Sequence, residues 1–251
     1  MKPGERRDQI ARAIRESGQL TVEDLAGRFS VSAETIRRDL STLAESGAVQ
    51  KVHGGARRLR LHHEGSFEER LATNAPAKQE IAAKIAAIVR PGDTLFIDTG
   101  STTLACAEQL VAVPRLTVIT NSLAIARLMG AGHSDIRVFL LGGTFSHGNA
   151  QTVGPLVLRQ IAGFQADYAL LTVSAVTAEV GAMDSSLDEA EVARSMMENA
   201  RQVVVLADSD KLGKTAGFRV CRLAEIDMLV SDRPPPPPLA RALAEAGVQV
   251  P

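Results

Sequence analysis

The chain has 251 residues, a formal net charge of −1, 45% hydrophobic residues and 23% charged residues. These fractions are those of ordinary globular proteins and exclude disorder, collagen or coiled coil as descriptions of the whole chain. No apolar run approaches the roughly 18–20 residues that a membrane helix needs, and the charged start resembles no secretory signal. Two cysteines, Cys106 and Cys221, are too few and too far apart for a disulfide framework or a zinc site. We therefore expect a cytoplasmic protein with no membrane association, no metal and no cofactor.

The charge is unevenly distributed along the chain. Residues 1–63 carry 12 Lys and Arg against 8 Asp and Glu, a net charge of +4, whereas the remainder carries 16 against 21, a net charge of −5. A basic amino-terminal segment on an acidic body is the pattern of a DNA-binding head joined to a domain that binds a small molecule. Chance fluctuation explains a difference of this size equally well, so charge alone does not decide the function.

Two helices are predicted first, over residues 5–17 and 21–30. Gly18 ends the first of them. Thr21 can cap the second, and Asp24, three residues on, can bond back to it in a loose capping box.

A third helix follows and is capped by Ser32. Three residues at helical spacing form its apolar stripe toward the core: Ile36, Leu40 and Leu43. Thr35, Arg37 and Arg38 lie near its amino-terminal end and away from the stripe. A short helix followed by one with hydroxyl and Arg side chains at its start is the geometry that enters a DNA major groove. Arg reads guanine edges there, whereas Ser and Thr more often hold phosphates.

Residues 48–58 alternate apolar and polar side chains around a double glycine, Gly54-Gly55, and predict a two-stranded wing with a tight turn. We expect the basic side chains of the wing to lie near the DNA backbone: Lys51, His53, Arg57 and Arg58. On pattern alone, an ordinary three-helix domain with a solvated basic face stays open as the alternative.

Residues 59–77 are polar with weak periodicity and are interpreted as a linker that includes one short strand or helical turn. Adjacent His62 and His63 have no carboxylate or thiol at helical spacing, so we interpret them as exposed side chains and not as metal ligands.

From residue 78 onward, helices alternate with short apolar runs. Helices are predicted over 81–89, 104–111, 123–129, 190–200 and 239–246. Strands are predicted over 94–97, 116–119, 136–141, 168–173, 202–207 and 226–230. This alternation implies right-handed crossovers and a mostly parallel sheet covered by helices on both faces. The polyproline stretch 234–238 is expected to be a stiff, extended connector to the last helix, with prolines that cannot themselves form helix or central strand.

Polar or glycine-rich loops follow four of the predicted strands, at 98–103, 120–122, 142–143 and 208–211. Ligands of parallel sheets bind beyond the carboxyl ends of the strands. In the first loop a glycine allows close approach of an anion, and the following helix supplies free amides and the positive end of its dipole. A plain capping turn explains any one loop, but four together favour a phosphate-containing ligand.

The third helix and the wing also carry a family resemblance. Residues 31–40, VSAETIRRDL, followed by residues 52–56, VHGGA, closely resemble the signature of the DeoR family of bacterial transcription regulators. In that family the first motif is the recognition helix and the second ends the wing. The resemblance implies that an operator in double-stranded DNA is contacted by Ser32, Thr35, Arg37, Arg38, Lys51, His53 and Arg57.

The body resembles the DeoR effector domain, which is related in fold to ribose-5-phosphate isomerase. The implied fold class is α/β, with a winged helix-turn-helix domain (1–58), a linker (59–77) and a Rossmann-like sensor domain (78–251). The resemblance implies a homodimeric or homotetrameric repressor whose DNA binding is relieved by a phosphorylated sugar or polyol, with glycerol 3-phosphate among the candidates. It carries over these effector-binding positions: Asp98, Gly100, Ser101, Thr102, Thr103, Thr120, Asn121, Ser122, Gly142, Gly143, Glu189, Asp208 and Lys211.

Three positions depart from the family pattern. Thr172 and Ala175 stand where glycine is usual, and Ala193 stands where lysine is common. Added bulk would shrink the pocket, and a lost cation would weaken anion binding. A constitutive DNA-binding regulator with a decayed pocket therefore stays open as an alternative. We expect no enzyme, because the acidic motif typical of the isomerase is absent around residues 172–176.

Overall fold

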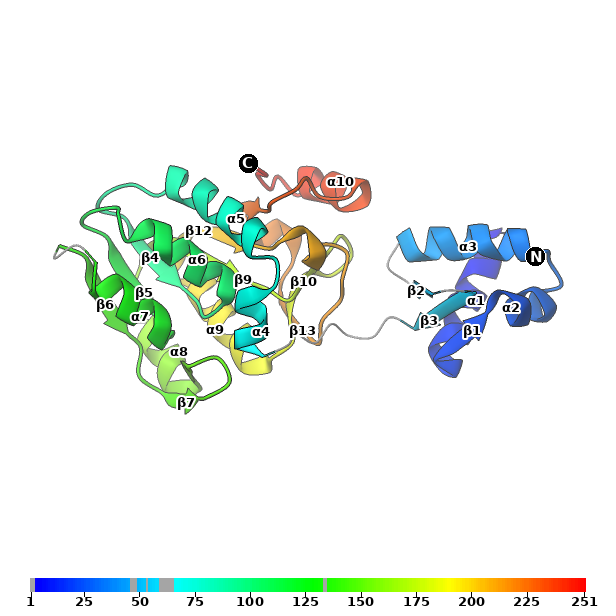
Figure 1. Cartoon of the computed structure of the whole chain (residues 1–251), viewed down its shortest axis with the longest axis horizontal. Coiled ribbons are helices and arrows are strands. Elements are labelled where there is room, and N and C mark those ends of the chain that lie inside the picture. Colours follow the sequence, from blue (N-terminus) through cyan, green and yellow to red (C-terminus); the bar gives the residue numbers. More distant parts are fainter. Residues whose placement is uncertain (1–2, 46–48, 53, 59–65, 133–134) are drawn as a thin grey trace. The chain divides into compact units, whose positions relative to one another are not determined.

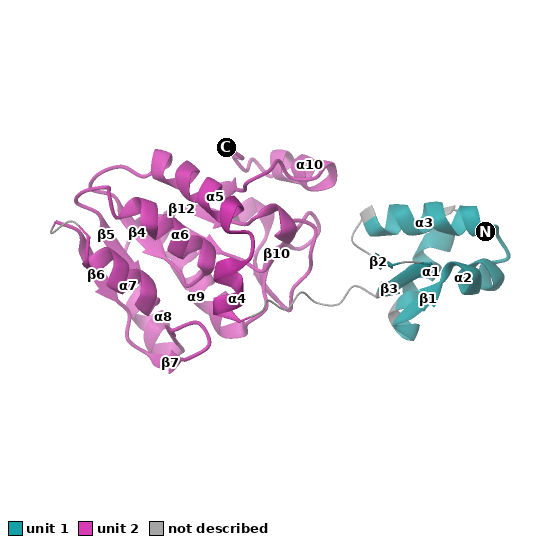
Figure 2. Cartoon of the chain, viewed as in Figure 1, with its two compact units in different colours: residues 1–61 teal, residues 62–251 magenta. Residues whose placement is uncertain are grey.

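The computed structural model describes residues 3–45, 49–52, 54–58, 66–132 and 135–251 (Figure 1). The chain divides into two compact units, unit 1 (Met1–Leu61) and unit 2 (His62–Pro251) (Figure 2).

The described residues of unit 1 form three helices and a small antiparallel sheet of strand order β1-β3-β2. Its elements are α1 (Pro3–Ser17), β1 (Gln19–Thr21), α2 (Val22–Phe29), α3 (Ala33–Glu45), β2 (Val49–Val52) and β3 (Gly55–Arg58). The predicted capping box is confirmed: Asp24 N donates to Thr21 Oγ1 (3.1 Å) and Thr21 N donates to Asp24 Oδ2 (3.2 Å). The predicted stripe of α3 is also confirmed, because Ile36, Leu40 and Leu43 are buried in one core. Strand β1 was not predicted, since three residues are too few to show an alternation.

The two glycines of the wing serve different physical purposes. Gly54 has φ +77°, a left-handed conformation that favours glycine. Gly55 pairs with Thr21 of β1, and a Cβ at Gly55 would lie only 2.3 Å from the carbonyl oxygen of Leu20. The first glycine makes the turn of the wing, and the second allows β1 and β3 to pair.

Unit 2 is built on a six-stranded parallel sheet. Its strands, in sheet order, are β14 (Met228–Val230), β12 (Ala200–Leu206), β9 (Ala166–Thr172), β4 (Thr94–Ile97), β5 (Thr117–Thr120) and β6 (Arg137–Leu140). Its helices are α4 (Phe67–Ala72), α5 (Ala75–Ile88), α6 (Ser101–Leu110), α7 (Leu123–Gly130), α8 (Pro155–Ile161), α9 (Leu187–Glu198) and α10 (Pro237–Glu245). The six predicted strands all lie in this sheet, and the predicted α/β fold class is confirmed.

Helices cover both faces of the sheet. Leu95 and Ile97 pack into one buried cluster with residues of α5, α6 and α7. Phe96, between them in β4, packs into the other cluster with residues of α8, α9 and α10. Successive side chains of a strand point to opposite faces, so a continuous apolar strand is what a doubly covered sheet requires.

Several short elements of unit 2 were not predicted. They are β7 (Thr144–Ser146) paired with β8 (Gln151–Val153), and β11 (Gly181–Asp184) lying between β10 (Ala175–Thr177) and β13 (Phe218–Cys221). All these pairs are antiparallel. Strands of three or four residues give no clear periodicity, and the residues of β8, β10 and β11 are buried without alternation.

The interpretation of residues 59–77 as a linker needs correction over 66–77, which forms α4 and the start of α5. A capping box begins α4, because Glu69 N donates to Ser66 Oγ (3.2 Å) and Ser66 N donates to Glu69 Oε2 (2.8 Å). None of the described residues of α4 is buried, so no apolar stripe signals this helix.

The polyproline prediction is wrong at its end, because α10 begins at Pro237. Residues in the first turn of a helix have no intrahelical partner for their N–H groups, so proline is tolerated there. Among the described helices, none has the length and apolar character needed to cross a membrane.

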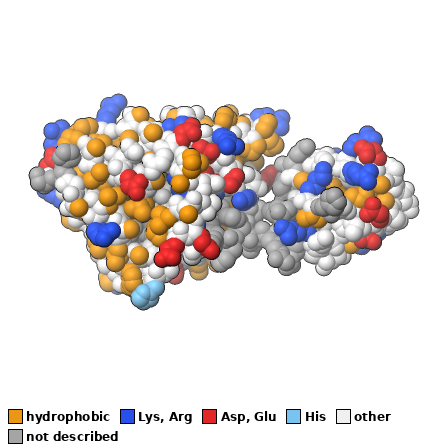
Figure 3. Space-filling model, in the orientation of Figure 1, with side chains coloured by type: hydrophobic (Ala, Val, Ile, Leu, Met, Phe, Trp, Pro, Cys, Tyr) orange, Lys and Arg blue, Asp and Glu red, His pale blue; other side chains and the backbone are white. Residues whose placement is uncertain are grey.

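Unit 2 leaves several large apolar side chains partly exposed near the β6 end of the sheet: Phe139, Leu140, Phe145 and Leu156. Figure 3 shows hydrophobic side chains gathered on one face of this unit. Exposed apolar groups of this kind often mark an interaction surface.

Candidate functional site

The surface of α3 presents two arginines to solvent. The side chains of Arg37 and Arg38 are 57% and 79% exposed, and both lie near Glu34, at 3.6 and 4.0 Å. Exposed ion pairs contribute only about 0–1 kcal/mol, so either guanidinium can exchange Glu34 for another anion at little cost. The buried Ile36 and Leu40 hold the other side of the helix against the core.

The hydroxyls at the start of α3 contact each other. Thr35 N donates to Ser32 Oγ (3.2 Å), and the two side-chain oxygens lie 2.9 Å apart. Lys51 of β2 donates from Nζ to Ser41 Oγ (3.1 Å), which brings a wing cation beside α3. Arg57 is half-buried in β3, and His53 lies outside the described residues. The structure therefore brings Lys51 next to the helix that carries Arg37 and Arg38.

One functional support of α3 was missed by the sequence analysis. Arg6 of α1 donates from Nε to Asp39 Oδ2 (2.6 Å) and from Nη2 to Asp39 Oδ1 (3.4 Å). The hydrogen bond to Asp39 raises the pKa of Arg6. Asp39 directly follows Arg38 but faces inward, so one carboxylate anchors α3 to α1 while the preceding arginines remain exposed.

In unit 2 the predicted polar loops follow neighbouring strands. The sheet order places β12, β9, β4, β5 and β6 side by side, all parallel. Their carboxyl ends therefore meet at one edge of the sheet, which is where ligands of such sheets bind.

A small polar pocket, partly open to solvent, lies at this edge and has a cavity volume of about 10 Å³. Its lining residues come from five elements or their adjoining loops: Asp98, Thr99, Asn121, Gln151, Asp184, Glu189 and Val192. Asp98, Asn121 and Glu189 are among the predicted effector positions. Thr99 lies in the predicted loop 98–103 and Val192 on a predicted helix, but neither was predicted as an effector position. Gln151 and Asp184 were missed because they lie on the short antiparallel strands that gave no periodic signal.

A chain of hydrogen bonds fixes the amides of the pocket. Thr99 Oγ1 donates to Asn121 Oδ1 (3.1 Å), and Asn121 Nδ2 donates to Gln151 Oε1 (3.2 Å). Gln151 Nε2 then donates to Glu189 Oε1 (2.8 Å). Each amide is held by a neighbour on both sides, so the pocket wall is preorganised.

Two carboxyl groups of the pocket, those of Glu189 and Asp98, retain protons more strongly than exposed ones. Burial and, to a smaller extent, the nearby Asp184 raise the pKa of Glu189 to about 7, against the lowering effect of the hydrogen bond from Gln151. Burial also raises the pKa of Asp98 well above its usual range, although Thr172 N donates to Asp98 Oδ2 (2.8 Å). Carboxyl groups that hold protons near neutral pH can donate as well as accept hydrogen bonds, which suits them to hydroxyl groups.

The loop after β4 continues into α6. Thr103 Oγ1 donates to the carbonyl oxygens of Asp98 (3.0 Å) and Gly100 (3.1 Å), while Ser101 begins the helix. Thr102 Oγ1 is buried and has no hydrogen-bond partner among the described residues. No side chain caps this helix at Gly100. The amino terminus of α6 therefore has free hydrogen-bonding capacity beside the pocket residues Asp98 and Thr99.

The next two predicted loops make local contacts. Ser122 N donates to Thr120 Oγ1 (3.0 Å), and Ser122 Oγ accepts from Ile125 N (3.4 Å) as the cap of α7. Gly142 exchanges hydrogen bonds with the side chain of Gln160, and a Cβ at Gly143 would lie 2.6 Å from a methyl group of Val157. These four predicted residues shape the edge of the sheet without lining the pocket.

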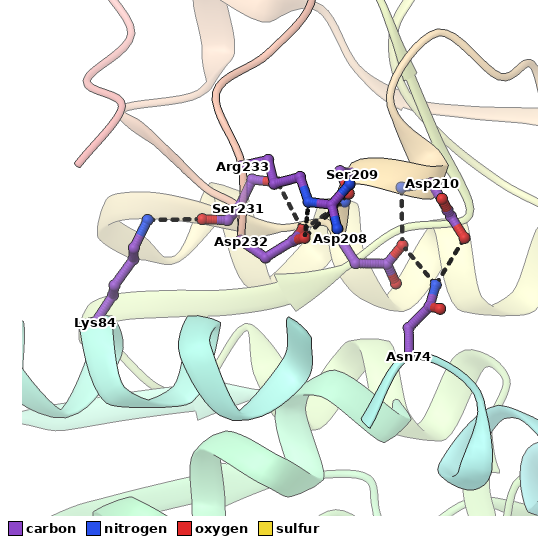
Figure 4. A network of polar contacts seen from close by, with 8 residues as sticks. All are labelled: Asn74, Lys84, Asp208, Ser209, Asp210, Ser231, Asp232 and Arg233. Atoms are coloured by element: carbon purple, nitrogen blue, oxygen red, sulfur yellow. Dashed lines mark hydrogen bonds and ion pairs between the residues drawn. The ribbon is translucent and has the colours of Figure 1, made fainter. Parts of the chain in front are cut away.

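Asp208 and Lys211 follow β12, which lies two strands from β4 in the sheet. Asp208 caps the short 3₁₀ helix η1 (Ser209–Lys211) and accepts from Asn74 Nδ2 (3.4 Å) (Figure 4). Lys211 Nζ donates to the carbonyl oxygen of Val173 (2.7 Å). Both side chains connect neighbouring loops of the same edge, and neither lines the pocket.

The three departures from the family pattern are all buried. Thr172 bonds Asp98 through its backbone N–H, and Ala175 lies in β10. Ala193 is 2% exposed and packs in the hydrophobic cluster under α9. Its side chain is therefore part of the core and does not line the pocket.

The comparisons with known proteins agree with this two-part geometry. The family profile described as "DeoR-like helix-turn-helix domain" matches residues 6–60, and "DeoR C terminal sensor domain" matches residues 73–233. The chain belongs to the DeoR family. As a DeoR-family member it is a DNA-binding transcriptional repressor, with the helix-turn-helix domain in unit 1 and the sensor domain in unit 2.

Curated DeoR-type relatives match over almost the whole chain. The HTH-type transcriptional repressor CsqR of Escherichia coli is 31% identical, with 98% of this chain and 94% of the relative covered. The glycerol-3-phosphate regulon repressor of the same species is 31% identical, with 100% and 99% covered. The HTH-type transcriptional repressor GlcR of Bacillus subtilis is 32% identical, with 94% and 91% covered. All three are named as repressors, and none is named as an enzyme.

Solved structures resemble this DeoR-family chain over part of its length. Ribose 5-phosphate isomerase A from Methanocaldococcus jannaschii has 17% identity and a TM-score of 0.41, with 56% of this chain and 55% of that chain covered. The β subunit of eIF2B from Chaetomium thermophilum has 16% identity and a TM-score of 0.49, with 72% and 55% covered.

Proposed function

We propose that the protein represses genes of sugar or polyol metabolism and that a phosphorylated sugar or polyol, bound in unit 2, relieves its binding to the operator. The observation that carries this proposal is the pairing of two unlike subsites at one sheet edge. One is the pocket with its buried carboxyl groups, and the other is the uncapped amino terminus of α6 with the buried hydroxyl of Thr102.

The two subsites suit the two ends of such a ligand. Asp98, Asp184 and Glu189 offer no positive charge to a phosphate, but they bind hydroxyl groups well, as do the amides of Asn121 and Gln151. The amino terminus of α6 offers backbone N–H groups and the positive end of a helix dipole, which favour a phosphate. We therefore assign the hydroxyl-bearing end to the pocket and the phosphate to Gly100–Thr103.

In unit 1 the proposal assigns DNA contacts to the exposed end of α3 and to the wing. Arg37 and Arg38 would read or neutralise DNA in the major groove, and Lys51 would contact its backbone. Ser32, Thr35, His53 and Arg57 complete the proposed surface. The net charge of +4 over residues 1–63 favours this contact.

The proposed assembly is a homodimer or homotetramer. Helix-turn-helix proteins bind paired half-sites as symmetric oligomers, and the exposed apolar side chains near β6 supply a surface for association. Light scattering would test it: a Leu140→Glu variant should show a smaller mass than the wild type, and a wild type of monomer mass would refute the assignment.

Thermal unfolding with an external dye, which suits a chain without Trp, tests the effector. A panel of phosphorylated sugars and polyols, including glycerol 3-phosphate, is compared with the unphosphorylated parents. A ligand that binds only the native state raises the unfolding midpoint. We expect a shift from a phosphorylated compound that its parent does not give. A panel without any shift would favour the constitutive regulator.

A further inference from the structure

Helix α4 follows the DNA-binding unit closely in sequence and has no buried side chain among its described residues. It is the first described element of unit 2, and in sequence it follows residues 59–65, after the last strand of the DNA-binding unit. None of its described residues is buried. Apolar packing therefore contributes little to holding α4, and polar contacts decide where it lies.

Arg70 supplies the main polar contact of α4. Its Nη2 donates to Asn149 Oδ1 (2.6 Å), and its guanidinium lies 5.5 Å from the ring centre of Phe67. Asn149 in turn donates from Nδ2 to Glu189 Oε1 (2.5 Å), which is the same oxygen that accepts from Gln151. Because Glu189 lines the pocket, two hydrogen bonds connect the pocket wall to α4.

The residues that follow α4 are tied to the same sheet edge. The buried Lys78 donates from Nζ to the carbonyl oxygens of Arg70 and Thr73, which closes the end of the helix. Asn74 donates from Nδ2 to Asp210 Oδ2 (2.8 Å) and to Asp208 Oδ1 (3.4 Å), as Figure 4 shows. Residues 66–78, here named the α4 segment, are therefore held from two of the loops that surround the proposed ligand site.

We propose that Arg70, acting through Asn149, couples the occupancy of the pocket to the α4 segment and by that route to DNA binding. The proposal deepens the proposed function and rests on it. A ligand hydroxyl that bonds Glu189 competes for the acceptor that holds Asn149, so the ligand favours a different arrangement of Arg70. A ligand shifts a conformational equilibrium only through such a difference in contacts between two states. Arg70 is thus a positioning residue and contacts no ligand itself.

The test uses the full chain, with an operator that the wild type selects from randomised DNA duplexes. Glycerol 3-phosphate and ribose 5-phosphate are the two probes. Arg70→Gln removes the guanidinium, and Asn149→Ala breaks the same connection from its other side. Arg70→Lys keeps a donor and serves as the conservative variant. Glu68→Gln, on the same helix with an exposed side chain, is the matched control. For each protein, the probe's thermal shift and the operator affinity with and without the probe are measured.

In the wild type we expect a probe to weaken operator binding by at least about fivefold, the lower end of common allosteric couplings. In Arg70→Gln and Asn149→Ala the thermal shift should persist while the change in operator affinity falls to within about twofold of none. Arg70→Lys should recover part of the response, and Glu68→Gln should behave like the wild type. A role in stability alone would lower the melting temperature of the variants without separating ligand binding from the DNA response.

Two results would overturn the inference. If Arg70→Gln and Asn149→Ala release the operator as the wild type does, the coupling does not pass through Arg70, while the proposed function stands. If neither probe raises the unfolding midpoint of the wild type or weakens its binding to the operator, the proposed function fails for these compounds. The inference that rests on it then fails too. The wild-type measurements alone distinguish the second result from the first.

Discussion

The side chain of Thr172 occupies the space that a Cβ on Gly100 would fill, since that Cβ would lie 2.3 Å from Thr172 Oγ1. Gly100 has an extended backbone, with φ −171°, so this glycine is needed for the approach of Thr172 and not for its own conformation. The sequence analysis explained Gly100 by the approach of an anion. In this chain the threonine that replaces the usual glycine at 172 and the glycine at 100 fit together.

Gly100→Ala should therefore destabilise unit 2 by about 1–3 kcal/mol, the usual cost of overpacking a core. Thr172→Gly, introduced into the same chain, should remove most of that cost by vacating the space. Urea unfolding of the two single variants and the double variant gives the interaction energy directly. Gly130→Ala is the control, because a Cβ there meets nothing within 4 Å. Additive costs in the double variant would contradict the fit between the two residues.

The pKa of Glu189 predicts a pH dependence of stability. Burial raises this pKa from 4.5 to about 7, so between these values the folded protein holds a proton that the unfolded chain has released. The free energy of unfolding should then fall as pH rises from about 4.5 to 7, by about 3 kcal/mol in all, and stay low above pH 7.

Glu189→Gln tests this dependence, because the amide oxygen still accepts from Asn149 and Gln151 but does not titrate. Chemical unfolding at pH 5, 6, 7 and 8 (roughly spanning the transition) should show a smaller decline in the variant than in the wild type. Asp98 contributes a decline of the same sign in both proteins, and because the charge of Glu189 helps to raise the pKa of Asp98, the difference between them reports Glu189 together with this coupling. If the free energies of unfolding of the two proteins change with pH in parallel, the pKa of Glu189 is not raised in the folded state.

Arg38→Ala should weaken binding to the selected operator by about 1–3 kcal/mol while the fold stays intact, as expected for an arginine that reads a base edge. Arg12→Ala removes the same charge from an exposed position on α1 and serves as the control for net charge. Fluorescence anisotropy with labelled operator measures both. Equal affinities for Arg38→Ala and the wild type would remove Arg38 from the proposed DNA surface.

The two wing glycines should differ in their tolerance of alanine. At Gly54 a Cβ meets nothing within 4 Å, and the cost of the left-handed backbone is about 1–2 kcal/mol. At Gly55 a Cβ would meet backbone atoms of Leu20 and Thr21, which cannot give way without breaking the pairing of β1 with β3. Limited proteolysis of unit 1 should thus be much faster in Gly55→Ala than in Gly54→Ala. A reversed order would show that the turn, and not the approach of β1, is what the motif protects.

Local sequence signals determined most of the fold. The capping box of Thr21 and Asp24, the stripe of α3 and the six apolar strands of unit 2 each depend on residues close together in the chain. The same signals placed Asp98 and Asn121 at strand ends, whereas Glu189 was indicated by the family resemblance. The family motifs in α3 and the wing indicated DNA binding before any contact was known.

Only the tertiary structure decided which of these residues share a pocket. Gln151 and Asp184 join Asp98 and Glu189 because two short antiparallel strands fold back over the sheet edge, and no periodic pattern announces such strands. The contact of Arg70 with Asn149 spans 79 residues of sequence. Contacts of that kind depend on how separate elements pack, whereas caps and periodicities depend on neighbours in the chain. For this reason the sequence predicted the elements and the tertiary structure determined the site.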